Sequence, residues 1–286
     1  MSHLLCFGLG YSAGYLAERM HTEGWTISGT VRTSEAADRV RGLGYMPIDI
    51  ASSAEGLRTA LPAVTHVLVS APPDAEGDPL LVQHAADIAT APNLAWIGYL
   101  STIGVYGDRN GAWVDETTAP NPQTDRSRWR LNAEKAWHAL GRSKGCRVEV
   151  FRLSGIYGPG RSAVDNLRAG TARRIVKPGH VFNRVHVVDI ANVLAAAIKS
   201  GGGHDIYNVA DDEPASSENV LLYAAQLLGV APPPPTPIAS IPSPMARSFY
   251  AECRRVSNQR IKNDLGVKLA YPTYREGLRA ILRVAS

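Results

Sequence analysis

The stretch that decides the fold is HLLCFGLGYSAG, residues 3–14. An apolar run of strand length leads into Gly8, Gly10 and Ala13, which have the spacing G-x-G-x-x-A. In such a turn the first glycine allows a tight bend, the second lets the backbone approach a diphosphate, and the small residue lets the next helix pack on the strand. The helix would offer its first N–H groups to the phosphates. We therefore favour a dinucleotide-binding site, and the alternative is a glycine turn that binds no ligand. Its first residues are Gly8, Gly10, Tyr11, Ser12 and Ala13.

Apolar runs of strand length alternate with helical patterns through the first half of the chain. Strands are expected at 3–9, 25–31, 45–50, 64–73, 94–102 and 146–154, and helices at 13–24, 34–44, 54–62, 80–91 and 128–145. Strands that are each followed by a helix form a parallel sheet through right-handed crossovers. The pattern predicts an α/β fold with a doubly wound parallel sheet.

After residue 155 the alternation becomes irregular, which indicates a second, smaller α/β lobe. We expect a dinucleotide-binding domain over 1–155, to which 186–212 returns, and a substrate-binding lobe over 156–286. Helical patterns are found at 216–229, which begins with an N-capping serine, and at 274–284. Residues 230–244 are rich in proline and are expected to form an extended surface connector.

Composition narrows the classes of function. The chain has 286 residues and a net charge of +4, and no long basic run, so binding to nucleic acid is not indicated. The three cysteines are far apart and form no metal-binding pattern, which suggests a reducing compartment. No secretory signal and no apolar run of about 18 residues is seen. We expect a cytoplasmic protein without a membrane segment or a metal.

The end of the second expected strand bears on which cofactor is bound. A site for NAD usually has an acidic residue there, which accepts a hydrogen bond from the ribose 2′-hydroxyl. No acid occurs from Thr26 to Ser34, whereas Arg32 is placed to hold a 2′-phosphate. NADP is therefore preferred, NAD is possible, and a solvated Arg32 is the alternative. Further cofactor contacts are expected where the third and fourth strands end, at Asp49, Ile50, Ser70 and Ala71.

The order of motifs resembles the extended short-chain dehydrogenase/reductase superfamily, of the NAD-dependent epimerase/dehydratase type. The matching segments span nearly the whole chain: GLGYSAG, YLSTIGVYGD, VDETTAPNP, RLNAEKAW, FRLSGIYGPGR, NRVHVVDIANVLAAAI and IYNVADDEP. The resemblance implies a Rossmann domain, a smaller substrate domain, a nicotinamide cofactor and frequently a nucleotide-sugar substrate. It is closest to an atypical subgroup that lacks the family's Tyr-x-x-x-Lys pair.

Two positions depart from the family pattern. Its first loop usually reads G-x-x-G-x-x-G, but Phe7 stands at the first position here. Alignment of RLNAEKAW places Arg126 where the family has its catalytic Tyr and Arg130 where it has Lys. A guanidinium stays protonated, so Arg126 cannot serve as a general acid or base. Arg130 could still donate to the ribose of the nicotinamide.

Other residues near the expected reaction centre follow from the same resemblance. Ser101 or Thr102 would hold the substrate oxygen, and Tyr106 is either a substitute acid/base or a packing residue. Candidates for contact with an anionic substrate are Arg126, Arg152, Tyr157 and Arg161. Asp115 and Glu116 either position a ligand or are solvated loop acids, and His186 is expected to be structural.

Two functions remain open at this point. One is an NADP-dependent oxidoreductase or an epimerase-like enzyme with a modified site, acting on a small molecule such as a nucleotide sugar or another anion. The other is a non-catalytic NADP-binding redox sensor or regulatory protein. The oligomeric state also has two alternatives. The resemblance implies a homodimer formed through a four-helix contact that includes the long helix, and the alternative is that this helix is buried within one subunit. The substrate is not indicated by the sequence.

Overall fold

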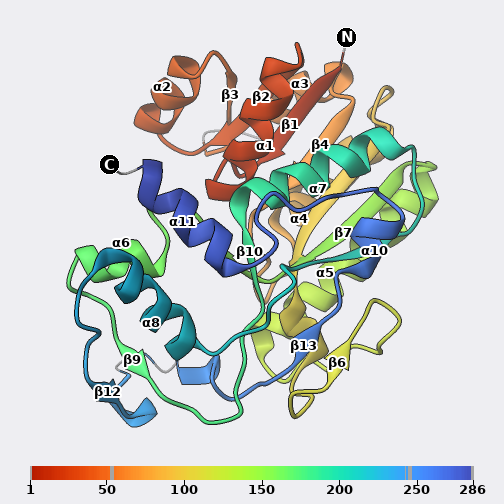
Figure 1. Cartoon of the computed structure of the whole chain (residues 1–286). Helices are drawn as coiled ribbons and strands as arrows, with labels where there is room; N and C mark the ends of the chain where they lie inside the picture. Colours follow the sequence, from red (N-terminus) through yellow and green to blue (C-terminus); the bar gives the residue numbers. More distant parts are fainter. Residues whose placement is uncertain (1, 52–54, 242, 244–246, 285–286) are drawn as a thin grey trace.

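The computed structural model describes residues 2–51, 55–241, 243 and 247–284. Seven parallel strands form a central sheet in the order β11-β7-β5-β4-β1-β2-β3 (Figure 1). The strands are β1 (His3–Phe7), β2 (Thr26–Val31), β3 (Met46–Asp49), β4 (His66–Val69), β5 (Trp96–Thr102), β7 (Arg147–Leu153) and β11 (Ile206–Val209). The predicted doubly wound parallel sheet is confirmed. β11, which lies within residues 186–212, forms one edge of it.

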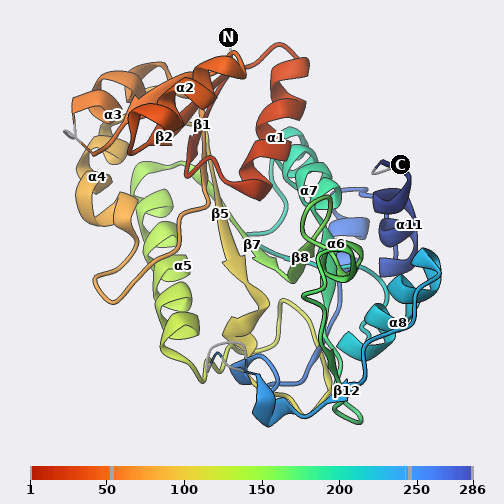
Figure 2. The ribbon, with the colours of Figure 1, turned by 90° about the vertical axis from the view of Figure 1, so that its left-hand side faces the viewer.

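Helices cover both faces of the sheet, as an all-parallel sheet requires. They are α1 (Tyr11–Thr22), α2 (Ser34–Gly42), α3 (Glu55–Ala60), α4 (Pro79–Thr90), α5 (Asp125–Lys144) and α7 (Val187–Ser200). Figure 2 shows α4 and α5 on one side of the strands and α1 and α7 on the other. Leu16 of α1 and Val193 of α7 belong to one buried cluster, and Ile88 of α4 and Trp137 of α5 belong to the other. The two faces of the sheet thus have separate apolar cores.

A smaller group of helices has a core of its own. It consists of α6 (Ala163–Arg168), α8 (Ser217–Leu228) and α11 (Tyr274–Val284), which pack against one another. The helical signals read from the sequence for α8 and α11 are confirmed, and Ser216 caps α8 by accepting from the backbone N–H of Asn219 at 3.0 Å. Tyr157, Val164, Tyr274 and Leu278 fill the space between these helices.

Short elements join distant parts of the chain. The paired strands are β8 (Gly155–Tyr157) with β10 (Arg184–His186), β6 (Trp113–Val114) with β13 (Arg255–Val256), and β9 (Arg174–Ile175) with β12 (Pro235–Thr236). Helical turns occur at η1 (Leu61–Ala63), η2 (Ile103–Tyr106), η3 (Ile238–Ser240) and α10 (Gln259–Asn263). Elements of two to five residues have too few positions for a hydrophobic period.

Two predicted segments differ in detail from the structure. The helix expected over 54–62 is α3 followed by the η1 turn, and residue 54 lies outside the described residues. The proline-rich connector contains both the extended β12 and the η3 turn, and its residues 242 and 244 also lie outside them. Within the described ranges, no helix has the length and apolar character needed to cross a bilayer.

His186 is the structural residue that the sequence indicated. Its Nδ1 accepts from the backbone N–H of Val188 at 3.3 Å and so caps α7. The ring is 2 % exposed and packs against Tyr157 and Tyr271. Burial lowers its pKa to about 4, because the charged imidazolium would lose its hydration.

This burial makes stability dependent on pH. The folded-state pKa of His186 lies below the unfolded value near 6.5, so stability is present above pH 6.5 and is lost as pH falls toward 4. Asn can still cap α7 but does not titrate. Between pH 7 and pH 4 we therefore expect the free energy of unfolding of His186→Asn to fall by about 3 kcal/mol less than that of the wild type. Urea denaturation of both proteins at each pH measures this difference. The same loss of unfolding free energy in both proteins would contradict the prediction.

Candidate active site

A cleft of about 910 Å³ opens at the carboxyl ends of the sheet strands. It lies where β1 and β4 are neighbours. From β1 the next strands, β2 and β3, are added toward one edge of the sheet, and from β4 the later strands are added toward the other edge. Crevices of this kind are the usual ligand sites of doubly wound folds. Its walls include the start of α1, the ends of β4, β5 and β7, the first turns of α5, and residues 181–183.

Gly8 forms the turn at the end of β1. Its φ of +87° is a conformation that L side chains rarely adopt. A Cβ at this position would lie 2.9 Å from Ser70 Oγ and 3.2 Å from the backbone N of Ala71. The Gly8 N–H donates to Thr30 Oγ1 at 2.9 Å, and Ser70 donates to the Gly8 carbonyl. These contacts hold together the ends of β1, β2 and β4.

The N-terminus of α1 faces the cleft without a capping side chain. Gly10 is the N-cap residue, and no acidic residue occurs in the first turn. A Cβ on Gly10 would meet nothing within 4 Å, and Gly10, Tyr11 and Ser12 all line the cleft. Ala13 is fully buried against the sheet. The helix therefore offers uncapped N–H groups and its positive end to an anion beside open space.

The expected adenosine-side residues lie along the same edge of the sheet. Arg32 is exposed directly after β2, and Thr33 next to it caps α2 by accepting from the backbone N–H of Ala36. Asp49 ends β3, where its Oδ1 accepts from the N–H of Ala51 at 2.8 Å, and the N–H of Ile50 donates to Val31. The sheet thus brings these positions into line with the Gly8 turn.

A buried ion pair stands behind the reaction end of the cleft. Glu134 of α5 and Arg152 of β7 are each 2 % exposed and are joined by hydrogen bonds of 2.7 and 3.2 Å. Ser101, near the end of β5, donates to Glu134 Oε1 at 2.5 Å. The Arg152 guanidinium also lies over the ring of Tyr106, 4.9 Å from its centroid. Three elements of the scaffold therefore meet at one carboxylate.

The structure separates the roles of the two neighbouring hydroxyls on β5. The proton of Ser101 is committed to Glu134. Thr102 lines the cleft, and its hydroxyl oxygen accepts from the N–H of Gly104 at 3.1 Å, which leaves its own proton available to donate. Of the two, Thr102 is the hydroxyl suited to hold an oxygen atom of a ligand.

Three of the arginines expected at the site line the cleft. Arg126 and Arg130 stand one helical turn apart on α5, and Arg161 lies across from them after β8. Arg130 is half-buried, donates to the carbonyl of Leu100 and lies 5.8 Å from the ring centroid of Tyr99. The Arg161 guanidinium stands over the ring of Tyr11 at 5.9 Å. The cleft therefore carries positive charge at two separate places.

The structure does not bring three other candidates to the cleft. Tyr106 is fully buried, and its hydroxyl donates to Asn208 Oδ1 at 2.8 Å. Burial raises the pKa of Tyr106, the opposite of what a neutral-pH base requires. Arg152 is committed to Glu134, and the Tyr157 hydroxyl donates to the carbonyl of Thr273 at 3.3 Å inside the smaller core. All three have structural contacts that keep them from a ligand.

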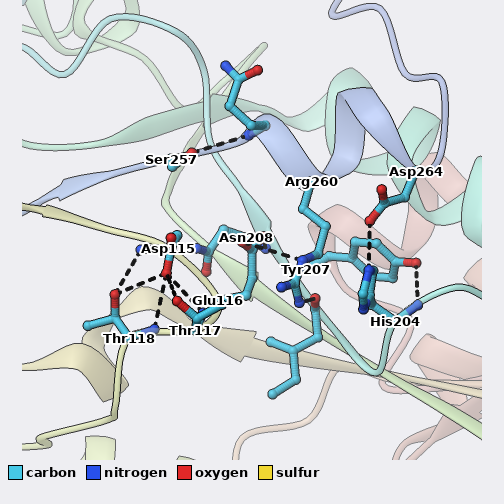
Figure 3. Close-up of polar contacts among 12 residues, drawn as sticks. Asp115, Glu116, Thr117, Thr118, His204, Tyr207, Asn208, Ser257, Arg260 and Asp264 are labelled. Carbon is cyan, nitrogen blue, oxygen red and sulfur yellow. Dashed lines mark hydrogen bonds and ion pairs between the residues drawn. The ribbon is translucent and has the colours of Figure 1, made fainter.

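Asp115 and Glu116 also have structural partners (Figure 3). Asp115 Oδ1 accepts from the N–H and hydroxyl groups of Thr117 and Thr118 and so closes its own turn. Glu116 Oε1 accepts from the backbone N–H of Asn208 at 2.8 Å, and its other oxygen lies 3.7 Å from Arg260. Glu116 thereby ties its loop to β11 and α10 (Figure 3).

Sequence reasoning missed several residues of the site. Glu134 lies in the RLNAEKAW segment, but no local pattern indicates that its carboxylate reaches β5 and β7. Ser154 follows β7 and lines the cleft, and its buried hydroxyl has no hydrogen-bond partner within the described part of the chain. Arg254 and Glu252 line the far wall as an ion pair of 2.7 Å. They are about 100 residues beyond the matching motifs of the first half, so only the tertiary fold places them.

The fold and the cleft together define a dinucleotide-binding α/β protein of the doubly wound type. The profile of the "NAD dependent epimerase/dehydratase family" matches residues 8–210, and the chain belongs to that family. The resemblance noted from the sequence motifs is thus confirmed.

Similarity to individual proteins extends over the full chain. A solved structure of a "functionally unknown conserved protein" from Silicibacter pomeroyi is 45% identical, with a TM-score of 0.90 and 99% of each chain covered. Protein YeeZ of Escherichia coli K12 is 28% identical, covering 95% of this chain and 97% of YeeZ. UDP-glucose 4-epimerase of Thermus thermophilus, solved with NAD, has a TM-score of 0.75 at 20% identity and covers 100% of each chain, which shows a shared fold.

We expect Glu134→Gln to destabilise the protein by about 3 to 5 kcal/mol, because it leaves the buried charge of Arg152 without an opposite charge. Urea denaturation at pH 7 measures the loss. Asp38→Asn is the control, since the Asp38–Arg41 pair is exposed, and it should cost less than about 1 kcal/mol. Similar small losses in both variants would show that the buried pair does not hold the scaffold together.

Proposed function

We propose that this protein binds NADP in the cleft and acts as an oxidoreductase or epimerase-like enzyme on a small anionic molecule, such as a nucleotide sugar. The observation that carries this proposal is the uncapped N-terminus of α1, which borders the same cleft as the hydroxyl of Thr102. The N-terminus of α1 suits a diphosphate, and the hydroxyl of Thr102 suits a reacting oxygen.

The residues along the sheet edge fit a nicotinamide dinucleotide. Gly10, Tyr11 and Ser12 would hold its diphosphate, with the open space beside Gly10 leaving room for the phosphates. Ser70 and Ala71 would border its nicotinamide half, and Asp49 and Ile50 its adenine. Arg32 would grip the 2′-phosphate that distinguishes NADP from NAD. When bound, the cofactor supplies or accepts a hydride.

On the substrate side, Thr102 would donate its free proton to the substrate oxygen. Arg130, held by the Leu100 carbonyl, would keep a positive charge beside the ribose of the nicotinamide. Arg126 stays protonated, and the Tyr106 hydroxyl is buried against Asn208. A water molecule in the cleft is therefore our choice for the group that carries the proton.

The second candidate is a non-catalytic NADP-binding sensor or regulatory protein. Its support is the presence of Arg126 and Arg130 where the family has its proton-transfer pair. Saturable NADP binding without turnover on a broad panel of carbonyl compounds and nucleotide sugars would favour the sensor. Cofactor-linked turnover of any member of the panel would favour the enzyme. The cytoplasmic location and the homodimer stay predictions.

We expect Arg32→Ala to weaken NADP binding about 10- to 100-fold, because it removes charge-assisted hydrogen bonds to the 2′-phosphate. NAD affinity should change less than about twofold, since NAD lacks that group. Isothermal titration calorimetry with each cofactor measures both. Arg39→Ala, an exposed arginine on α2, is the control. Equal losses for NADP and NAD would refute the role of Arg32.

We expect Thr102→Val to lower kcat about 100-fold or more with unchanged NADP affinity, because the donor to the reacting oxygen is lost. The variant also loses the acceptor of the Gly104 N–H, so thermal denaturation checks that it folds. The absorbance change of the nicotinamide on any substrate found in the panel measures it. Thr90→Val, on the exposed side of α4, is the matched control. Full activity in Thr102→Val would remove Thr102 from the mechanism.

A further inference from the structure

We propose that Arg126, supported by the charge of Arg130, binds an oxyanion of the substrate itself, a carboxylate or a phosphate, beside Thr102. This inference rests on the proposed function and names the recognition that replaces the family's proton-transfer pair. The two arginines lie on successive turns of the same face of α5, and both border the cleft together with Thr102 and Gly104.

The charges around the cleft favour an anion. Its described lining contains the arginines Arg126, Arg130, Arg161 and Arg254 and the acids Asp125 and Glu252. Both acids already have cationic partners. Glu252 lies 2.7 Å from Arg254, with each side chain only 11% exposed. Asp125 lies 2.5 Å from Arg128, which is not among the described residues that line the cleft. Among the charged residues that line the cleft, arginines thus outnumber acids, and two of these arginines, Arg126 and Arg130, lie on α5.

Arg130 is held at the end of β5, close to the start of α4. It donates to the carbonyl of Leu100 and faces the ring of Tyr99. Burial raises the pKa of the nearby Asp78 carboxyl, and the charge of Arg130 opposes that rise. Guanidinium groups stay protonated, so Arg126 and Arg130 keep two positive charges on this face of α5. The fork of five N–H donors on each arginine matches the two oxygens of a carboxylate or phosphate.

The cofactor's diphosphate is not the anion that α5 would bind. That diphosphate belongs at the end of β1, where the first turn of α1 and the Arg161–Tyr11 pair lie. Arg126 and Arg130 instead flank the end of β5, and β4 separates β5 from β1 in the sheet. Two strand spacings place the sites about 10 Å apart. Arg126 and Arg130 would therefore bind a separate oxyanion of the substrate, close to the oxygen that Thr102 would hold.

The test is a calorimetric titration of the full chain, first with NADP alone and then, at saturating NADP, with orthophosphate and with malonate. Saturation fills the sites at α1 and Arg32, so the anion reports on the α5 site. We expect one of the two anions to bind. Binding of orthophosphate indicates a substrate phosphate, and binding of malonate indicates a substrate carboxylate. Binding of neither anion would overturn the proposal.

Variants of α5 assign the binding to its residues. We expect Arg126→Gln to weaken the anion about 10- to 100-fold and Arg126→Lys to weaken it less, because Lys keeps the charge but not the fork. Arg128→Gln is the matched control, an exposed arginine of the same helix, and should bind as the wild type does. Arg126 is exposed, so its variants should fold normally, which thermal denaturation checks. Unchanged anion affinity in Arg126→Gln would overturn the proposal.

The failure of this inference can be told from the failure of the proposed function. If NADP does not bind in the first titration, the proposed function fails. The comparison of Arg126→Gln with Arg128→Gln in cofactor-free protein then still decides whether α5 holds an oxyanion. If NADP binds and the anion affinities of the two variants are equal, the inference alone is wrong.

Discussion

The buried ion pair of Glu134 and Arg152 is the interaction on which the arrangement of the site depends. Removing two charges from water is costly, and only close contact and full hydrogen bonding offset that cost. Here one carboxylate is shared by Arg152 of β7 and Ser101 of β5, and it is carried by α5. The rotation of α5 about its axis is thereby set, because any other orientation would leave Glu134 or Arg152 unpaired in the core. Arg126 and Arg130, two turns and one turn before Glu134, must then face the cleft.

The same network extends from Arg152 to β11 and to the loop that carries Glu116. Arg152 lies over Tyr106, the hydroxyl of Tyr106 donates to Asn208, and the backbone of Asn208 donates to Glu116. On the opposite wall, the Tyr11 hydroxyl donates to the carbonyl of Pro159 at 3.0 Å, which joins the start of α1 to the segment after β8. Contacts of this kind tie the nucleotide-binding edge to the segments that would surround a substrate. Positions contributed by distant parts of the chain can therefore stay in register with one another.

The chemistry of the cleft differs from that of a site built on a tyrosine and a lysine. A tyrosine can exchange a proton, whereas an arginine can only attract and orient. In the function we propose, Arg126 and Arg130 attract and orient an anion instead of transferring a proton, and Thr102 donates its hydroxyl proton to the reacting oxygen. Such a site would hold its ligand by charge and geometry and would leave proton transfer to a water molecule. The fold tolerates this change because the supporting pair behind it, Glu134 and Arg152, does not involve either substituted position.

The sequence by itself determined the parallel sheet, the order of its main strands and helices, and the dinucleotide turn. These features depend on local signals, namely strand-length apolar runs and a glycine spacing that only a tight turn explains. The tertiary structure alone decided which polar side chains face the cleft. Tyr106 and Asn208 are 102 positions apart, and Arg152 and Glu134 belong to different elements, so no local pattern reveals that they pair. A side chain's role follows from the partner that satisfies its charge or hydrogen bonds, and that partner is found only when the chain has folded.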